Sequence, residues 1–263
     1  MERRDFIAWS LLLGLGGLPL SAVEIEPVSS EIPLEKALFV NCLQRTQTQQ
    51  LLKEYLMAAL NSSYKNPKQE LPKSVEKYDR RFRILYDYFV KRIKQPEARK
   101  KMEEARSLWE ESKKLLLAPP SQENALKLQK NFQAMIRLLS APKVLKVKKS
   151  FKAVAKTGSL CRDPLYMSNL YLMKLWGIRI PDYEERMRRY ITHFRDNLQF
   201  LEHYPENTPE VDKLLKEAGR NFIFFEMMYR SKRTAIPTLI SKKADDIFTN
   251  IQRIKQIYGQ MIR

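Results

Sequence analysis

The amino-acid sequence predicts an all-α protein made of two tandem up-and-down helical bundles related by internal duplication. Only 7 of its 263 residues are glycine. Leu, Lys, Glu, Arg and Gln, which favour helices, are abundant, and no stretch alternates apolar and polar residues as a strand would. With 44% apolar residues, the chain can bury a normal core.

The first half, residues 33–142, is expected to contain four helices. A first helix runs to about Leu60, and Ser121 is expected to cap the fourth. Prolines mark the other boundaries, because a proline at a helix start loses no hydrogen bond whereas one in a helix interior does. Pro33 begins the first helix, and Pro72 ends the loop that follows it. Pro96 begins the third helix, Pro119 ends it, and Pro142 ends the fourth helix.

The second half, residues 143–263, repeats this order. Asp182 with Glu185 three residues later predicts a capping box, and Pro237 is expected to start the last helix. An aromatic stripe has matching spacing in the two halves: Tyr78, Phe82, Leu85 and Phe89 in the first, and Tyr183, Met187, Tyr190 and Phe194 in the second.

The first helix contains an unusually polar stretch, residues 41–56. One interpretation is an ordinary helix with a solvated polar face, opposite an apolar stripe on Leu43, Leu51, Leu52 and Tyr55. The other is that the polar side chains meet other parts of the protein. The spacing alone allows both.

This stretch, Gln44-Arg45-x-x-Thr48-Gln49-Gln50-x-x-Lys53-x-Tyr55-Leu56, resembles the helix motif Q-R-x-x-S-Q-R-x-x-K-x-Y-L. The motif opens the N-terminal sensor domain of type IV pili methyl-accepting chemotaxis transducers, which is similar to periplasmic nitrate-sensor domains. The resemblance covers roughly residues 36–260. It implies that motif helices face one another and bind a small anion between them, although Gln50 replaces the second arginine of the motif.

Applied to both halves, the resemblance implies that Arg45 and Arg162 close on one nitrate-like oxyanion or carboxylate, with Gln44 and Gln49 as amide donors. Pro164 predicts that the second motif helix starts at about Asp163, so that free amide groups beside Arg162 would favour an anion. The alternative is that both arginines pair with surface carboxylates.

The same docking brings together the two cysteines of the chain, Cys42 and Cys161. They are candidates for a disulfide between the halves if the chain is exported, and two unpaired buried thiols are the simpler alternative. Their spacing indicates no zinc or haem site, and no motif indicates a cofactor or a catalytic centre. A binding protein is therefore expected rather than an enzyme.

Residues 1–22 resemble an export signal that is cleaved after Ala22, which predicts a periplasmic location. Arg3 and Arg4 fit a twin-arginine signal or the charged start of a general secretory signal equally well. The sequence shows no second membrane segment, kinase or chemotaxis signalling region, so we expect the signal to pass to an unidentified protein partner.

The net charge of +18 attracts small anions, anionic lipids and nucleic acid alike, although an export signal argues against nucleic acid. The densest basic run includes Lys146, Lys148, Lys149 and Lys152, which form either a solvated helix face or a contact with lipid headgroups. Two alternatives to an anion sensor remain: a scaffold that has lost its ligand, and a basic binder of polyanions or envelope lipids.

Overall fold

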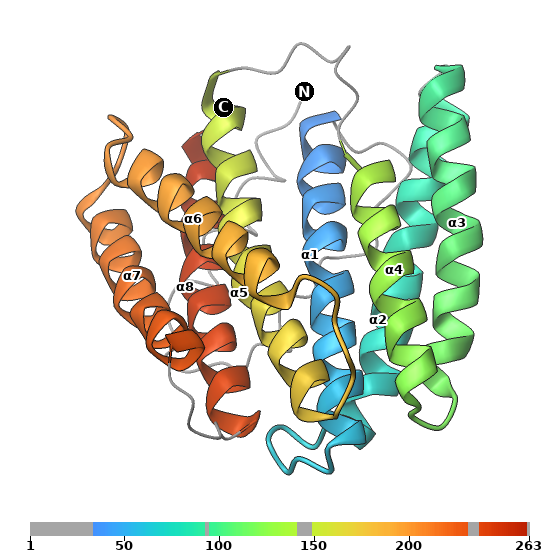
Figure 1. The fold of residues 1–263 in the computed structure, drawn as a ribbon. Coiled ribbons are helices and arrows are strands. Elements are labelled where there is room, and N and C mark those ends of the chain that lie inside the picture. Colours follow the sequence, from blue (N-terminus) through green and yellow to red (C-terminus); the bar gives the residue numbers. More distant parts are fainter. Residues whose placement is uncertain (1–33, 93–94, 141–148, 231–236, 262–263) are drawn as a thin grey trace. The chain divides into compact units, whose positions relative to one another are not determined.

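The computed structural model describes residues 34–92, 95–140, 149–230 and 237–261, and within these ranges every regular element is a helix (Figure 1). The all-α class is thereby confirmed. The elements are α1 (Leu34–Ala59), α2 (Pro67–Asp87) with a short π-helical extension (Tyr88–Arg92), α3 (Pro96–Leu117), α4 (Gln122–Leu138), α5 (Lys149–Leu175), α6 (Tyr183–Glu202), α7 (Pro209–Arg230) and α8 (Pro237–Met261). The expected export signal and its cleavage site lie outside the described residues.

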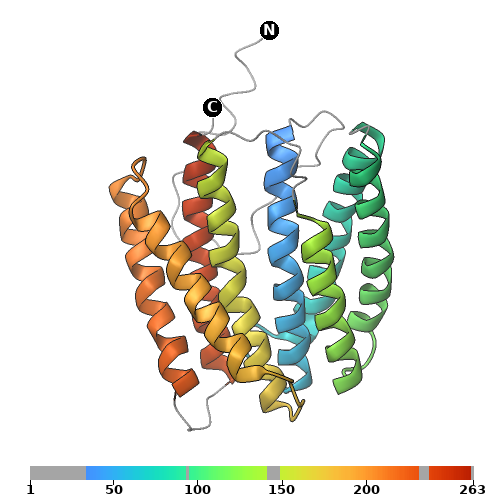
Figure 2. The same cartoon turned by 45° about the horizontal axis from the view of Figure 1, so that its top comes forward.

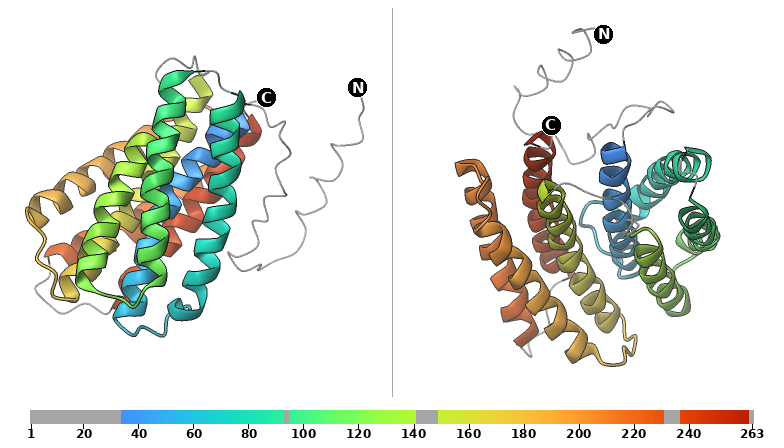
Figure 3. Two further views of the ribbon diagram at one scale, coloured as in Figure 1. Left: turned by 90° about the vertical axis from the view of Figure 1, so that its right-hand side faces the viewer. Right: turned by 90° about the horizontal axis from the view of Figure 1, so that it is seen from above.

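The helices form two groups of four with the same order of contacts. In the first, α1 and α3 each pack against α2 and α4; in the second, α5 and α7 each pack against α6 and α8. Viewed from above, the groups lie on either side of the contact between α1 and α5 (Figure 3). That these groups are the domains expected at 33–142 and 143–263, related by duplication, stays a prediction. Below, the first half means α1 to α4 and the second half means α5 to α8.

Several helix boundaries follow directly from local sequence. Pro67, Pro96, Pro209 and Pro237 each occupy the first position of a helix, where the missing N–H costs nothing. Ser121 precedes α4, and its Oγ accepts a hydrogen bond from the backbone N–H of Asn124 at 3.1 Å, so the predicted cap is confirmed.

Three local predictions are wrong. Pro72 lies inside α2 because the preceding loop already ends at Asn66, whose left-handed backbone (φ 43°) turns the chain into Pro67. Asp182 also has a left-handed backbone (φ 55°), and its side chain makes no capping hydrogen bond. Pro164 does not start a helix: α5 runs through it.

The continuity of α5 through Pro164 shows tertiary packing overriding local preference. An interior proline costs a helix about 3 kcal/mol. Leu160 and Leu165, on either side of it, are fully buried. Because burying a leucine contributes about 1.5–3 kcal/mol, keeping both in place offsets the cost of the proline.

Helix α1 is enclosed by other helices, with α5 on one side and α2 and α4 on the other (Figure 2). Gln44, Thr48 and Gln49 are 0% exposed. The solvated-face interpretation of this stretch is therefore wrong, and the polar side chains do meet other parts of the protein.

Polar contacts join the two halves. The amide nitrogen of Asn169 on α5 donates to the backbone oxygen of Gln49 at 2.9 Å and to its side-chain oxygen at 3.2 Å. The ammonium of Lys53 on α1 forms a buried ion pair with Asp245 on α8, which Lys65 also contacts at 2.7 Å. These directional bonds fix how α1 is aligned against the second half.

Replacing Asp245 by Ala should lower the free energy of unfolding by about 3–5 kcal/mol, because it leaves the ammonium of Lys53 buried without a counter-charge. Urea unfolding followed by circular dichroism measures the change. Asp246 is the matched control, because among the described residues its ion pair is with Lys242 on its own helix. Its change to Ala should cost less than about 1 kcal/mol, and equal losses in both variants would contradict the role of Asp245.

Candidate functional site

Arg45 and Arg162 approach each other where α1 packs against α5. Burial, and then the positive charge of Arg162, lowers the pKa of Arg45 to about 10. The Nε atom of Arg45 is buried and makes no hydrogen bond. In the described ranges neither guanidinium pairs with a carboxylate, so the surface ion pairs considered for them are not found there. Two cationic side chains are thus held together, and no carboxylate of the described ranges pairs with either of them.

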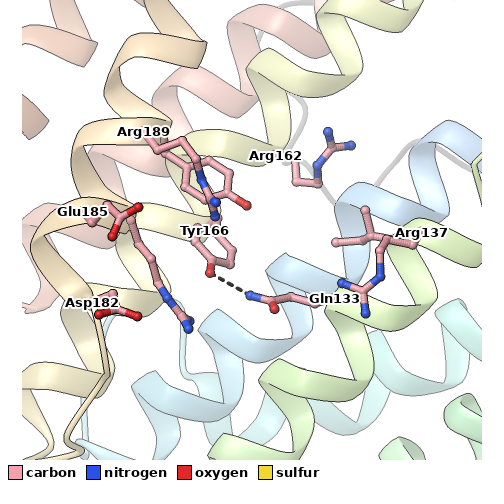
Figure 4. A pocket seen from close by; sticks show the side chains of 10 residues that line it. Gln133, Arg137, Arg162, Tyr166, Asp182, Glu185 and Arg189 are labelled. Carbon is pink, nitrogen blue, oxygen red and sulfur yellow. Dashed lines mark hydrogen bonds between the residues drawn. The ribbon is translucent and has the colours of Figure 1, made fainter.

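A pocket of about 350 Å³ opens beside Arg162, between α4 of the first half and α5 and α6 of the second (Figure 4). Four of its lining side chains are arginines: Arg137, Arg162, Arg186 and Arg189. Two are carboxylates, Asp182 and Glu185, so the lining carries an excess of positive charge. The remaining lining residues are Gln133, Ile136, Tyr166 and Tyr190.

The aromatic part of the pocket is held in place by direct contacts. The rings of Tyr166 and Tyr190 lie 4.1 Å apart between centroids, and Arg189 lies over the ring of Tyr190 at 5.5 Å. The amide nitrogen of Gln133 donates to the hydroxyl of Tyr166 at 2.6 Å, which joins α4 to α5 in the centre of the pocket (Figure 4). The pocket is therefore built by contacts between the halves.

The four pocket arginines share one property. Within the described part of the chain, none of them lies within ion-pair distance of a carboxylate, even though Asp182 and Glu185 line the same pocket. A guanidinium presents a planar set of N–H donors that matches the oxygens of a carboxylate, nitrate or phosphate. The arrangement therefore leaves several such donor sets available to an anion.

Of the four predicted ligand-binding residues, only Arg162 lines the pocket. The amide nitrogen of Gln44 donates to the backbone oxygen of Tyr78 at 3.2 Å, and Gln49 is bound to Asn169. Both glutamines bond buried groups of the protein instead of facing the pocket. Because α5 continues through Pro164, the free amide groups expected beside Arg162 are also absent.

Sequence reasoning missed Arg137, Arg186 and Arg189. The last two lie three residues apart on α6, a spacing that places them on one face of the helix. This spacing was the only feature of the local sequence that pointed to these arginines. Their meeting with Arg162 depends on how α4, α5 and α6 pack.

The two cysteines are free thiols in the structure, as in the simpler of the two alternatives, and the candidate disulfide between them stays a prediction. Lys146 and Lys148 lie outside the described residues, as do the side chains of Lys149 and Lys152. The expected headgroup contact therefore has no structural counterpart to report.

Beside Arg162, the buried carboxylate of Asp163 contacts His193 on α6, with 2.6 Å between Oδ2 and Nδ1. The ring of His193 also lies near Asn197, whose side-chain oxygen accepts a hydrogen bond from Lys156 at 2.6 Å. The hydrogen bond to Asp163 raises the pKa of His193, an effect that partial burial opposes.

No set of three or more His, Cys, Asp or Glu side chains in the described ranges is placed to hold a metal ion. The helices of the same ranges are too short or too polar to cross a membrane. Comparisons with known protein families, curated proteins and solved structures find no match for this chain. The resemblance to the sensor family therefore stays an expectation.

The pair between His193 and Asp163 predicts a pH dependence of stability. Because the folded-state pKa of His193 is raised, its contribution is fully present below its ordinary pKa of about 6.5 and is lost as pH rises through the raised value. The free energy of unfolding of the protein, minus that of a His193→Gln variant, should be larger at about pH 5.5 than at about pH 8.5.

Urea unfolding at a series of pH values measures this difference. The matched control is His203→Gln, because in the described part of the chain the ring of His203 bonds the backbone oxygen of Gln199 and no carboxylate. A difference for His193→Gln that is constant with pH would contradict the proposed pair.

Proposed function

We propose that the protein is a sensor-like binding protein that takes a small oxyanion or carboxylate into the pocket between α4, α5 and α6. The observation that carries the proposal is the set of four arginines around this pocket, none of which pairs with a described carboxylate. Arg162 lines this pocket and is also one of the ligand-binding residues that the resemblance implied.

The electrostatics of the site support an anion as the ligand. Four guanidinium groups gathered around a pocket that only two carboxylates line repel one another, and partial burial strengthens that repulsion. Arg137 and Arg189 are exposed, whereas Arg162 and Arg186 are half-buried. An anion that accepts hydrogen bonds from two or more of them relieves the repulsion and gains charge-assisted bonds that a neutral molecule does not.

The position of the pocket supports a signalling role. Arg137 belongs to the first half, whereas Arg162, Arg186 and Arg189 belong to the second. An anion held by arginines from both halves favours the arrangement in which α4 lies near α5 and α6. We propose that an unidentified protein partner, in the periplasm, reads this stabilised arrangement.

Two other functions were open from sequence: a scaffold without a ligand, and a basic binder of polyanions or lipids. A scaffold is expected to neutralise its half-buried arginines with carboxylates, and Arg45 and Arg162 lack such partners among the described residues. A binder of polyanions needs a broad basic surface rather than a pocket. The arginine-lined pocket therefore favours the small anion.

Binding of the correct anion should raise the melting temperature of the purified chain. We would screen nitrate, nitrite, phosphate, sulfate and small carboxylates by thermal shift at constant ionic strength. A ligand at ~100 times its dissociation constant stabilises the fold by ~2.7 kcal/mol, which is easily measured. The shift should be lost in Arg162→Gln and reduced in Arg189→Gln, because both side chains line the pocket.

Arg188→Gln is the matched control, because Arg188 is exposed on the same helix as Arg189 but does not line the pocket. It removes the same charge and should keep the shift. A shift produced by every anion and retained in Arg162→Gln would contradict the proposal and favour a basic polyanion binder. No shift with any anion would favour the scaffold.

A further inference from the structure

Cys42 lies where three helices meet. It shares α1 with Arg45, while α5 contributes Arg162 and α8 contributes Lys255, and the charges of all three act on its thiol. The side chain of Cys42 is partly exposed, whereas Cys161 on α5 is buried. The two cysteine residues therefore differ in how far they are buried.

Gly158 allows Cys42 to reach α5. A Cβ atom at this position would lie 2.4 Å from the sulfur of Cys42, which is closer than any real contact. Gly158 and Cys161 lie three residues apart on the same helix and therefore on the same face. The sulfur of Cys42 thus packs against the face of α5 that carries Cys161.

The pKa values of the two thiols are shifted in opposite directions. Burial alone would raise the pKa of Cys42, but Lys255, Arg45 and Arg162 outweigh it, and a hydrogen bond from Lys255 adds to their effect, so the pKa is lowered. Burial raises the pKa of Cys161. Lys255 is only 1% exposed, so its charge acts on Cys42 from within the protein interior.

We propose that Cys42 is a reactive thiolate that a hydroperoxide oxidises, and that Cys161 then forms a disulfide with it, linking α1 to α5. The inference does not depend on anion binding in the pocket. It rests on the cluster of Cys42 with three cations and on the contact of its sulfur with the α5 face that carries Cys161.

The chemistry balances in two steps. The thiolate of Cys42 attacks one oxygen of hydrogen peroxide, the O–O bond breaks, and the hydroxide released takes a proton to become water. The resulting sulfenic acid is attacked by the sulfur of Cys161: the S–S bond forms, the S–O bond breaks, and the departing hydroxide takes the thiol proton as water. Two thiols and one peroxide thus become one disulfide and two waters.

The first experiment measures the rate of iodoacetamide alkylation of Cys42 against pH in a Cys161→Ser variant. The half-maximal rate should fall at a lower pH than for free cysteine measured beside it, because each unit of lowered pKa raises the thiolate fraction about tenfold at acidic pH. Lys255→Met should move the profile back towards that of free cysteine. Lys242→Met, on the exposed face of the same helix, should not.

Arg45→Gln provides a second test that leaves Lys255 in place, should Lys255→Met fail to fold. It should also raise the half-maximal pH, because Arg45 is one of the charges that stabilise the thiolate. A profile for Cys42 that matches free cysteine, or one that neither variant moves, would overturn the proposal.

The second experiment treats the full chain with hydrogen peroxide and measures intact mass. The chain with both cysteines should lose two hydrogens. The Cys161→Ser variant should gain an oxygen as a sulfenic acid, which dimedone traps, and the Cys42→Ser variant should show no oxidation of its remaining cysteine. The proposal would be overturned if the chain with both cysteines kept both thiols after treatment. It would also be overturned if the remaining cysteine of the Cys42→Ser variant were oxidised as much as that of the Cys161→Ser variant.

Discussion

The burial of α1 is the constraint on which the other features depend. A buried polar group costs free energy unless it finds a hydrogen-bond partner, and a buried charge costs more unless it is paired. Gln49 therefore requires Asn169, and Lys53 requires Asp245. Both partners lie in the second half, so the polar residues of one helix determine how the two groups of four helices are joined.

The same burial explains where positive charge gathers. The chain has 48 Lys and Arg residues against 30 Asp and Glu, so carboxylates are too few to neutralise every cation. Arg45, Arg162 and Lys255 come together where α1, α5 and α8 meet. Arg162 both lines the neighbouring pocket and acts by its charge on the thiol of Cys42. Arg162 thereby connects the two proposals physically, although each is tested separately.

Helix α5 shows how close packing limits the choice of side chain. Gly158 has no side chain because the sulfur of Cys42 occupies the space where a Cβ would be. Pro164 is tolerated in the helix interior because the leucines around it are buried. Both residues weaken an isolated helix, and in the folded protein their cost is offset by contacts with α1 and with the rest of the second half.

The sequence by itself determined the all-α class and the positions of most helix starts. These properties depend on local physics: proline at the first position, the Ser121 cap and apolar residues at helical spacing act within a few residues. Only the tertiary structure decided that α5 continues through Pro164, that Gln44 and Gln49 bond the protein interior, and that three further arginines join Arg162 in a pocket. These outcomes depend on burial and on charges brought together from helices far apart in sequence, which no local pattern encodes.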